Sequence, residues 1–322
     1  MVAGVASAQN INAAGATFPY PIYNKWFTEY AALHPGVHIN YQSIGSGGGI
    51  KQASEGTVDF GASDGPMNDQ QLADAKIKLM HIPTVLGAVV PVYNIPGATS
   101  LNFSPEVIAG IYLGKITKWN DPRIAKDNPG VNLPEKPILP VYRSDGSGTT
   151  YIFTDYLSKI SPEWQSGSGK GTSVKWPTGI GQKGNEGVAG MVRQAPFSIG
   201  YVELIYALQN KMEYGTVKNA DGKFIKATPD AVTAAAAAAA KTMPADYRVS
   251  ITNAHGAESY PISSFTWLLI PTHFADPAKG KAVADFLVWM LDNGEGEASG
   301  MGYAPLPKQV QVMVRKSIAI VK

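Results

Sequence analysis

The feature that most constrains the fold is the regular alternation of short, β-branched apolar runs with segments that carry helix start and stop signals. The runs "VHINYQSI", "PTVLGAVVPVYNI" and "FSIGYVEL" have the composition of strands. The segment "SPEVIAGIYLG" has a serine at the cap position, a proline in the first turn and a closing glycine, which predicts a helix. Such alternation is typical of α/β proteins with largely parallel sheets. With 322 residues, the chain is long enough for two such units.

Composition excludes several classes of protein. A net charge of +2 is too small for binding nucleic acid by bulk electrostatics, so we expect no nucleic-acid partner. The lack of cysteine removes disulfides, thiolate metal sites, cysteine nucleophiles and a lipidated N-terminal cysteine. His34 and His38 flank a Pro-Gly turn and indicate no metal site. We expect a monomer without cofactor or metal.

The N-terminal residues suggest export. Ala6-Ser7-Ala8 fits the small-x-small pattern of a signal-peptidase site, and we interpret residues 1–9 as the remainder of a signal peptide or, alternatively, as a small-residue tail. No apolar run of about 18 residues follows, so the sequence predicts no membrane-spanning helix. We therefore expect a soluble, exported protein without a lipid anchor.

Three segments place glycines and hydroxyl residues directly at a helix start. They are "GATFPYPIYNKWFTEY", "SIGSGGGIKQ" and "RSDGSGTTYIFTDYL". The first turn of a helix has backbone N–H groups without intrahelical partners, at the positive end of the helix dipole. Glycine lets an anion approach these groups, and serine or threonine adds hydroxyl donors. One such start is an ordinary cap, but three in one chain, one of them beside Arg143, predict an oxyanion site.

Other glycine and serine motifs do not fit. No lysine stands in a G-x-x-x-x-G-K-[ST] pattern, and "GIGQKG" follows "KWPT" rather than a clear strand. Ser46 and Ser147 lie in "IGSGG" and "DGSGT", neither of which is G-x-S-x-G. A hydrolase that uses Ser147 or Ser46 as its nucleophile stays an alternative, although the sequence shows no base or metal for it.

Asp64 ends the strand-like run "VDFGASD" and suggests which oxyanion is bound. The ordinary interpretation is a turn or cap aspartate. A carboxylate beside an anion is favourable, however, if the anion carries a proton whose hydrogen bond the carboxylate accepts. Phosphate is protonated at neutral pH and sulfate is not, and sites built on one obligatory hydrogen bond reject analogues that lack it by about 10⁴–10⁵. Asp64 thus favours phosphate, with another tetrahedral oxyanion as the alternative ligand.

Six segments together carry a family resemblance. They are "AGATFPYPIYNKW", "SIGSGGGIKQASEGTVDFGASD", "IYLGKITKWND", "RSDGSGTTYIFTDYL", "TSVKWPTGIGQKGNEGVAG" and "IGYVEL". In this order, over nearly the whole chain, they closely resemble the periplasmic phosphate-binding proteins (PstS) of Pst-type ABC transporters. The resemblance implies a type II periplasmic binding protein with a Venus-flytrap fold. It implies phosphate buried in the cleft and delivered to a membrane ABC permease, without enzymatic activity.

The resemblance also implies the binding residues. Those of the first lobe are Thr17, Phe18, Ser46 and Asp64, and those of the second are Arg143, Ser147, Gly148 and Thr149. Phe18 would act through its backbone N–H and Arg143 would be the only cationic contact. Asp145 would pair with Arg143 and orient it. Gly49 and Thr150 vary a little around the motif core without touching the donors.

The fold class that we expect is α/β, with two lobes that each have a mainly parallel sheet flanked by helices. Lobe 1 would comprise residues 10–90 and 263–322, and lobe 2 residues 91–262. The segments "PTVLGAVVPVYN" and "SYPISSFTWLLIP" would be the hinge strands that cross between them. Phosphate would bridge the lobes and favour the closed form.

Overall fold

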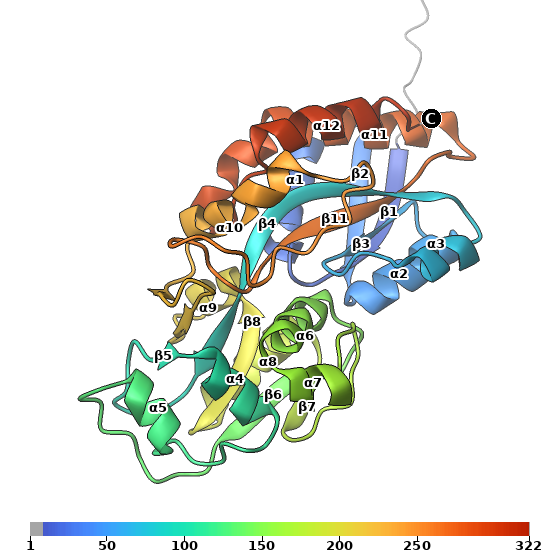
Figure 1. Ribbon diagram of the computed structural model, residues 1–322. Helices are drawn as coiled ribbons and strands as arrows, with labels where there is room; N and C mark the ends of the chain where they lie inside the picture. The colour runs from blue at the N-terminus through green and yellow to red at the C-terminus, as the bar shows by residue number, and fades with distance from the viewer. Residues whose placement is uncertain (1–8, 322) are drawn as a thin grey trace, which may run out of the picture.

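The computed structural model describes residues 9–321 and shows two lobes that share one eight-stranded sheet (Figure 1). The strand order is β2-β1-β3-β11-β4-β8-β6-β7, and a small second sheet has the order β10-β9-β5. The strands are β1 (Gln9–Gly15), β2 (Val37–Ser43), β3 (Phe60–Ser63), β4 (Leu79–Tyr93), β5 (Asn102–Phe103), β6 (Leu139–Arg143), β7 (Ile180–Gln182), β8 (Ser198–Glu203), β9 (Thr216–Lys218), β10 (Phe224–Ile225) and β11 (Ser263–Pro271).

Twelve α-helices and two 3₁₀ turns cover the sheet in the described part of the chain. The helices of its first half are α1 (Tyr20–Leu33), α2 (Ser46–Glu55), α3 (Asp69–Asp74), α4 (Pro105–Tyr112), α5 (Pro122–Asp127) and α6 (Gly148–Ile160). Those of its second half are α7 (Pro162–Gly167), α8 (Gly184–Gln194), α9 (Leu204–Gln209), α10 (Pro229–Lys241), α11 (Pro277–Asp292) and α12 (Lys308–Ile318), with η1 (Gly294–Glu297) and η2 (Ser299–Met301). Ser104 is at the cap position of α4, as the sequence indicates, but its side chain makes no capping hydrogen bond.

In the eight-stranded sheet, the outer strands of each lobe are parallel to their neighbours, and the antiparallel pairs lie at the centre. In the first lobe β1 is parallel to β2 and to β3, and in the second β6 is parallel to β7 and to β8. Strand β11 is antiparallel to β3 and β4, and β4 is antiparallel to β8. The predicted α/β class with two lobes is therefore confirmed, with three antiparallel pairings at the centre of the sheet.

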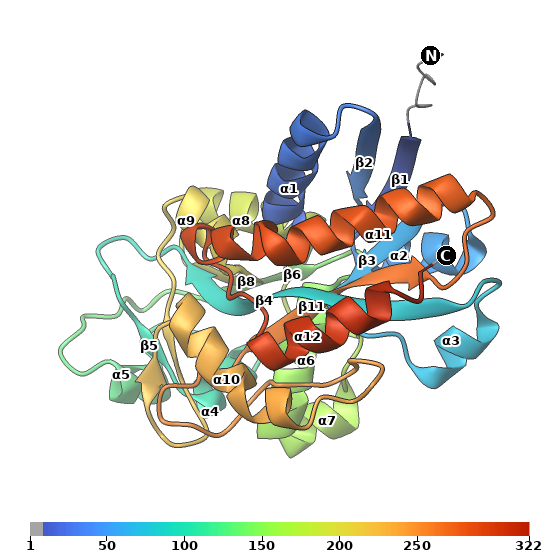
Figure 2. The same ribbon diagram turned by 90° about the horizontal axis from the view of Figure 1, so that it is seen from above.

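The long strand β4 belongs to both lobes. Residues 79–88 pair with β11, and residues 89–93 pair with β8 (Figure 1). Every residue of β4 except Met80 is buried, which explains its nearly continuous apolar sequence. Figure 2 shows α11 and α12 side by side across one face of the sheet, where they contact β1 and β4 respectively.

The lobe boundaries and the N-terminus are only partly described. Helix α10, within the range 91–262 assigned to lobe 2, packs against β4, β11 and α12, and the exact bounds stay a prediction. Residues 1–8 of the expected signal-peptide remnant lie outside the described residues, and Gln9 is the first residue of β1. None of the helices in residues 9–321 has the length and apolar character of a membrane span.

The close approach of α2 to the sheet requires a glycine at position 49. A Cβ atom on Gly49 would lie 2.5 Å from Ala62 O and 2.6 Å from the Cα of Gly15, and both contacts are with backbone atoms. Gly49 therefore has a packing role, although the sequence marked it only as a variable position of the motif.

We predict that Gly49→Ala lowers the free energy of unfolding by about 1–3 kcal/mol, because α2 must move away from β1 and β3. The matched control is Gly190→Ala in α8, where a new Cβ would meet no atom within 4 Å. This control is expected to stabilise the protein by about 0.5–1 kcal/mol, because alanine loses less backbone entropy in a helix. Urea unfolding checks both variants, and equal effects would contradict the packing argument.

Candidate functional site

The three glycine-rich segments meet where the two lobes face each other. Strands β1 and β3 of the first lobe and β6 of the second end there, and helices α2 and α6 begin there. The N–H of Gly47 donates to Gly146 O across the cleft at 2.8 Å. A Cβ atom on Gly148 would lie 2.4 Å from both Asp64 Oδ2 and Ser46 Oγ, so α6 abuts the first lobe closely. The lobes are therefore closed in this structure.

The structure brings together all eight residues predicted to bind the anion, and each of them is buried. They are Thr17, Phe18, Ser46, Asp64, Arg143, Ser147, Gly148 and Thr149. Arg143 Nη1 contacts Thr17 Oγ1 at 3.2 Å and Thr149 Oγ1 at 3.5 Å, which joins residues of both lobes. An anion bound among these residues would be screened from solvent, so each electrostatic contact with it would be strengthened.

Several backbone N–H groups at this point have no acceptor within residues 9–321. Among them are those of Phe18, Ser46, Gly148 and Thr149. At α6 the reason is the cap, because Ser147 Oγ accepts the N–H of Thr150 at 3.0 Å and leaves the first two helical N–H groups free. The N–H of Ser147 itself donates to Thr172 O at 2.8 Å, so Ser147 offers the site its hydroxyl only.

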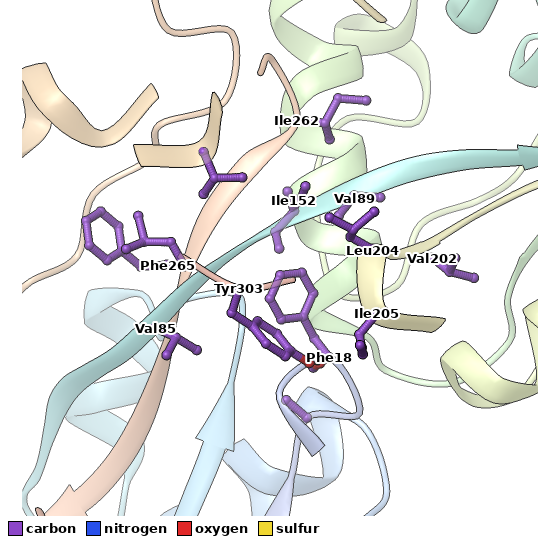
Figure 3. Close-up of a cluster of buried hydrophobic side chains, with 14 of the residues drawn as sticks. Phe18, Val85, Val89, Ile152, Val202, Leu204, Ile205, Ile262, Phe265 and Tyr303 are labelled. Carbon is purple, nitrogen blue, oxygen red and sulfur yellow. Dashed lines mark hydrogen bonds between the residues drawn. The ribbon is translucent and has the colours of Figure 1, made fainter. Parts of the chain in front are cut away.

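Phe18 is held by contacts to its carbonyl and its ring. Tyr303 Oη donates to Phe18 O at 2.6 Å, and the two rings lie with centroids 6.3 Å apart. Figure 3 shows both residues beside Val85 of β4 and Leu204 of α9, in the apolar cluster where the lobes join. This packing fixes the turn after β1 and leaves the N–H of Phe18 as its polar contribution, as the family resemblance implies.

Arg143 is the only buried lysine or arginine in residues 9–321. Its guanidinium makes two hydrogen bonds to Asp145, Nε to Oδ1 at 2.7 Å and Nη2 to Oδ2 at 2.5 Å. The N–H of Gly184 also donates to Asp145 Oδ1, at 3.1 Å. Burial acts to raise the pKa of Asp145, but the hydrogen bonds and charge of Arg143 outweigh it and hold that pKa below its usual range. Asp145 thus holds the Arg143 guanidinium in place and offsets its charge.

Asp64 contributes to the same site from the first lobe, beside Ser46 and the start of α6. Its Oδ1 accepts from Thr266 Oγ1 at 2.8 Å, and its Oδ2 from Ser46 Oγ at 3.4 Å. Burial raises the pKa of Asp64 to about 7, against the lowering effects of Thr266, Arg143 and Ser46. The carboxylate is therefore an acceptor with few partners in a dry environment, which suits a ligand that brings its own proton.

Two polar residues of the site were not predicted from the sequence. Asn185, fully buried near the start of α8, hydrogen-bonds Thr17 and Thr149, and Thr266 of β11 supports Asp64. The sequence indicated no clear strand before the segment Gly179–Gly184. In the structure this segment itself contains β7, and its last residue is the first of α8. A threonine within the apolar run "SSFTWLLIP" was the available signal for Thr266, whereas Asn185 had none beyond its place in a family motif.

A large hollow on the second lobe lies apart from this site. A surface hollow of about 1060 Å³ between α4, α5 and α7 contains none of the eight residues and is lined by side chains of both charges. No group of three or more histidine, aspartate or glutamate residues within residues 9–321 is arranged to hold a metal ion.

Comparison with known proteins identifies the family. A model described as a PBP superfamily domain matches residues 2–293. The phosphate-binding protein PstS of Pasteurella multocida is 48% identical over 305 residues, which cover 94% of this chain and 88% of that relative. PstS of Xylella fastidiosa strain Temecula1 is 47% identical, covering 92% of this chain and 81% of that relative. The chain belongs to the PstS family of phosphate-binding proteins.

Solved structures agree with this assignment at the level of the fold. A high-affinity periplasmic phosphate-binding protein, PfluDING, bound with phosphate, superposes with a TM-score of 0.77 at 24% identity, covering 96% of this chain and 94% of that one. A phosphate ABC transporter substrate-binding protein from Clostridium perfringens gives a TM-score of 0.68 at 20% identity, covering 93% and 100%. The predicted family and the prediction of a binding protein rather than an enzyme are confirmed by the PstS relatives.

We predict that Asp64→Asn makes the stability of the phosphate-free protein less sensitive to pH. Because burial raises the pKa of Asp64 to about 7, the folded protein holds this proton more tightly than the unfolded chain. The stabilisation is complete below about pH 4 and is lost as the pH rises to about 7. Relative to the wild type, the variant should gain about 2–4 kcal/mol between pH 5 and pH 8. Guanidinium unfolding at both pH values measures this difference.

The control for this experiment is Asp74→Asn, at an exposed carboxyl at the end of α3. Its stability should follow that of the wild type at both pH values. Parallel behaviour of Asp64→Asn and Asp74→Asn would show that Asp64 is not desolvated in the folded protein.

Proposed function

We propose that this protein binds inorganic phosphate between its closed lobes and delivers it to a membrane ABC permease of the Pst type. The observation that carries the proposal is that Asp64, a buried acceptor, lies in the same site as free N–H donors from both lobes. Membership of the PstS family and the names of its relatives support the choice of ligand.

The donors suit a dianion or monoanion held by many hydrogen bonds. Four N–H groups come from Phe18, Ser46, Gly148 and Thr149, and hydroxyls come from Thr17, Ser147 and Thr149, with Arg143 as the single cation. Each hydrogen bond to a charged group contributes about 1.5–3 kcal/mol, and a micromolar dissociation constant needs about 8 kcal/mol net. About ten donors therefore suffice, even after the free energy needed to order and close the lobes.

Charge neutralisation is not the main source of affinity. Asp145 already pairs with Arg143, and Asp64 faces the site as a second carboxylate. Such a site selects the anion by its protonation. A phosphate P–OH donates to Asp64, whereas sulfate at neutral pH would bring two acceptors face to face in a buried place.

The same contacts account for closure. Closing the lobes without a ligand would bury the free N–H groups of both lobes without partners, which is unfavourable. Phosphate supplies partners to residues of both lobes only when these lie together. Ligand binding therefore shifts the population toward the closed form.

The remaining parts of the proposal concern context. We propose a periplasmic monomer without a lipid anchor, with phosphate as its ligand and no cofactor or nucleic-acid partner. A hydrolase based on Ser147 is disfavoured because the Ser147 hydroxyl caps α6 and makes no hydrogen bond to a basic side chain within residues 9–321. Another tetrahedral oxyanion is the alternative ligand that the next experiment addresses.

We predict tight one-to-one binding of phosphate, measured by calorimetry on protein stripped of endogenous ligand. An excess of sulfate of about 100-fold should leave the dissociation constant of phosphate unchanged, because the site is expected to bind sulfate about 10⁴–10⁵ times more weakly. Asp64→Asn should weaken phosphate binding by at least about 100-fold, because the amide presents a donor to the P–OH, and it should spare or improve sulfate binding.

Full competition by sulfate in the wild type would overturn the phosphate assignment and favour another oxyanion. Asp74→Asn serves again as the control, because its carboxyl is exposed and hydrogen-bonds Gln70 rather than any of the eight site residues. Phosphate binding by Asp64→Asn equal to that of the wild type would show that Asp64 is not the acceptor of the ligand's proton.

A further inference from the structure

The amide of Asn185 lies between two threonine hydroxyls, one from each lobe. Its Nδ2 donates to Thr17 Oγ1 at 2.8 Å and to Thr149 Oγ1 at 3.0 Å, and its backbone N–H lies 3.4 Å from Thr17 Oγ1. Asn185 is fully buried and is the second residue of α8. The residue before it, Gly184, donates its N–H to Asp145, so the start of α8 is tied to Arg143's partner.

The orientation of this amide is set by its other end. Asn185 Oδ1 accepts the N–H of Glu203 at 3.0 Å, at the end of β8. Rotating the amide by half a turn would place its NH₂ group against the Glu203 N–H and its oxygen against Thr17 and Thr149. Because that N–H can only donate, the amide must present its NH₂ group to both threonines.

The consequence follows from counting lone pairs on the two hydroxyl oxygens. A hydroxyl oxygen has two acceptor lone pairs and one proton to donate. Thr17 Oγ1 receives hydrogen bonds from Asn185 Nδ2 and Arg143 Nη1, and Thr149 Oγ1 receives hydrogen bonds from the same two groups. The acceptor capacity of both oxygens is thereby used, and within residues 9–321 neither hydroxyl proton has an acceptor.

We propose that Asn185 is a positioning residue that holds the hydroxyls of Thr17 and Thr149 as donors toward bound phosphate. This inference rests on the proposed function and adds a specific role for a residue that does not itself need to touch the ligand. Asn185 and Arg143 together occupy the lone pairs, so the protons of Thr17 and Thr149 point to the anion. One amide therefore orients a hydroxyl group from each lobe.

Asparagine suits this role better than a charged residue. An aspartate at position 185 would accept from the threonine hydroxyls and turn their protons away from the anion. It would also add a third carboxylate to a site that already contains Asp64 and Asp145. A cation at position 185 would donate to the threonines but would give the site affinity for anions regardless of their protonation.

The experiment compares phosphate dissociation constants by calorimetry for Asn185→Ala and Asn185→Asp with the wild type. Asn185→Ala should weaken binding about 10- to 100-fold, since two hydrogen bonds to a charged ligand lose their fixed direction. Asn185→Asp keeps the shape and can still accept from Glu203 N–H, and it should weaken binding further than Asn185→Ala. If Asn185→Ala proves unfolded by circular dichroism, Asn185→Asp alone carries the comparison.

A double-mutant cycle separates this role from a merely structural one. In the background Thr17→Val/Thr149→Val, which lacks both hydroxyls, Asn185→Ala should weaken binding less than about threefold further. The matched control is Asn128→Ala, a buried asparagine whose amide donates to Asn102 O and Ile124 O in the second lobe. That control should lower the melting temperature and leave the phosphate dissociation constant unchanged.

The outcomes distinguish the two proposals. If the wild type binds phosphate but Asn185→Asp binds it equally well, the role of Asn185 is wrong and the proposed function stands. The same conclusion follows if Asn185→Ala has the same effect with and without the threonine hydroxyls. If the wild type does not bind phosphate, the proposed function and the role of Asn185 are both overturned.

Discussion

The pairing of β4 with β11 is the constraint on which the rest of the structure depends. These two buried strands run antiparallel from Leu79 to Ala88, and β4 then continues into the second lobe to pair with β8. Without this shared strand, the parallel strands of each lobe would form a separate sheet, and nothing would bring the ends of β1 and β3 to the end of β6. Because β4 belongs to both halves of the one sheet, the strand ends of the two lobes face each other. The glycine-rich helix starts that follow these strands therefore share one site.

The site built in this way balances its charges before a ligand enters. Arg143 is matched by Asp145, while Asp64 is held by two hydroxyls and no cation in direct contact. Glu203 adds a further buried carboxyl near Phe18, and burial raises its pKa well above the ordinary value, which favours its neutral form. Selectivity can then come from the direction of hydrogen bonds, because no large excess of positive charge attracts every anion alike.

The sequence predicted those parts of the fold and site that are encoded locally. Strand-forming runs, the glycine-rich helix starts and Asp64 at the end of a strand are readable from neighbouring residues, and the family resemblance added the backbone N–H of Phe18. What it missed depends on tertiary contacts. Strand β7 has three residues and is stabilised by its pairing with β6, and Asn185 gains its partners only when the two lobes come together.

The orientation of hydroxyl protons connects the fold to the chemistry. A threonine hydroxyl can donate or accept, so its residue type alone does not specify an anion site. Here the N–H of Glu203, a backbone group fixed at the end of β8, sets the orientation of the Asn185 amide, and that amide with Arg143 occupies the lone pairs of Thr17 and Thr149. The end of β8 in the second lobe thus sets the direction in which the hydroxyls of Thr17 and Thr149 donate. Since Thr17 belongs to the first lobe, this donor arrangement is complete only in the closed form, which couples recognition of the anion to closure.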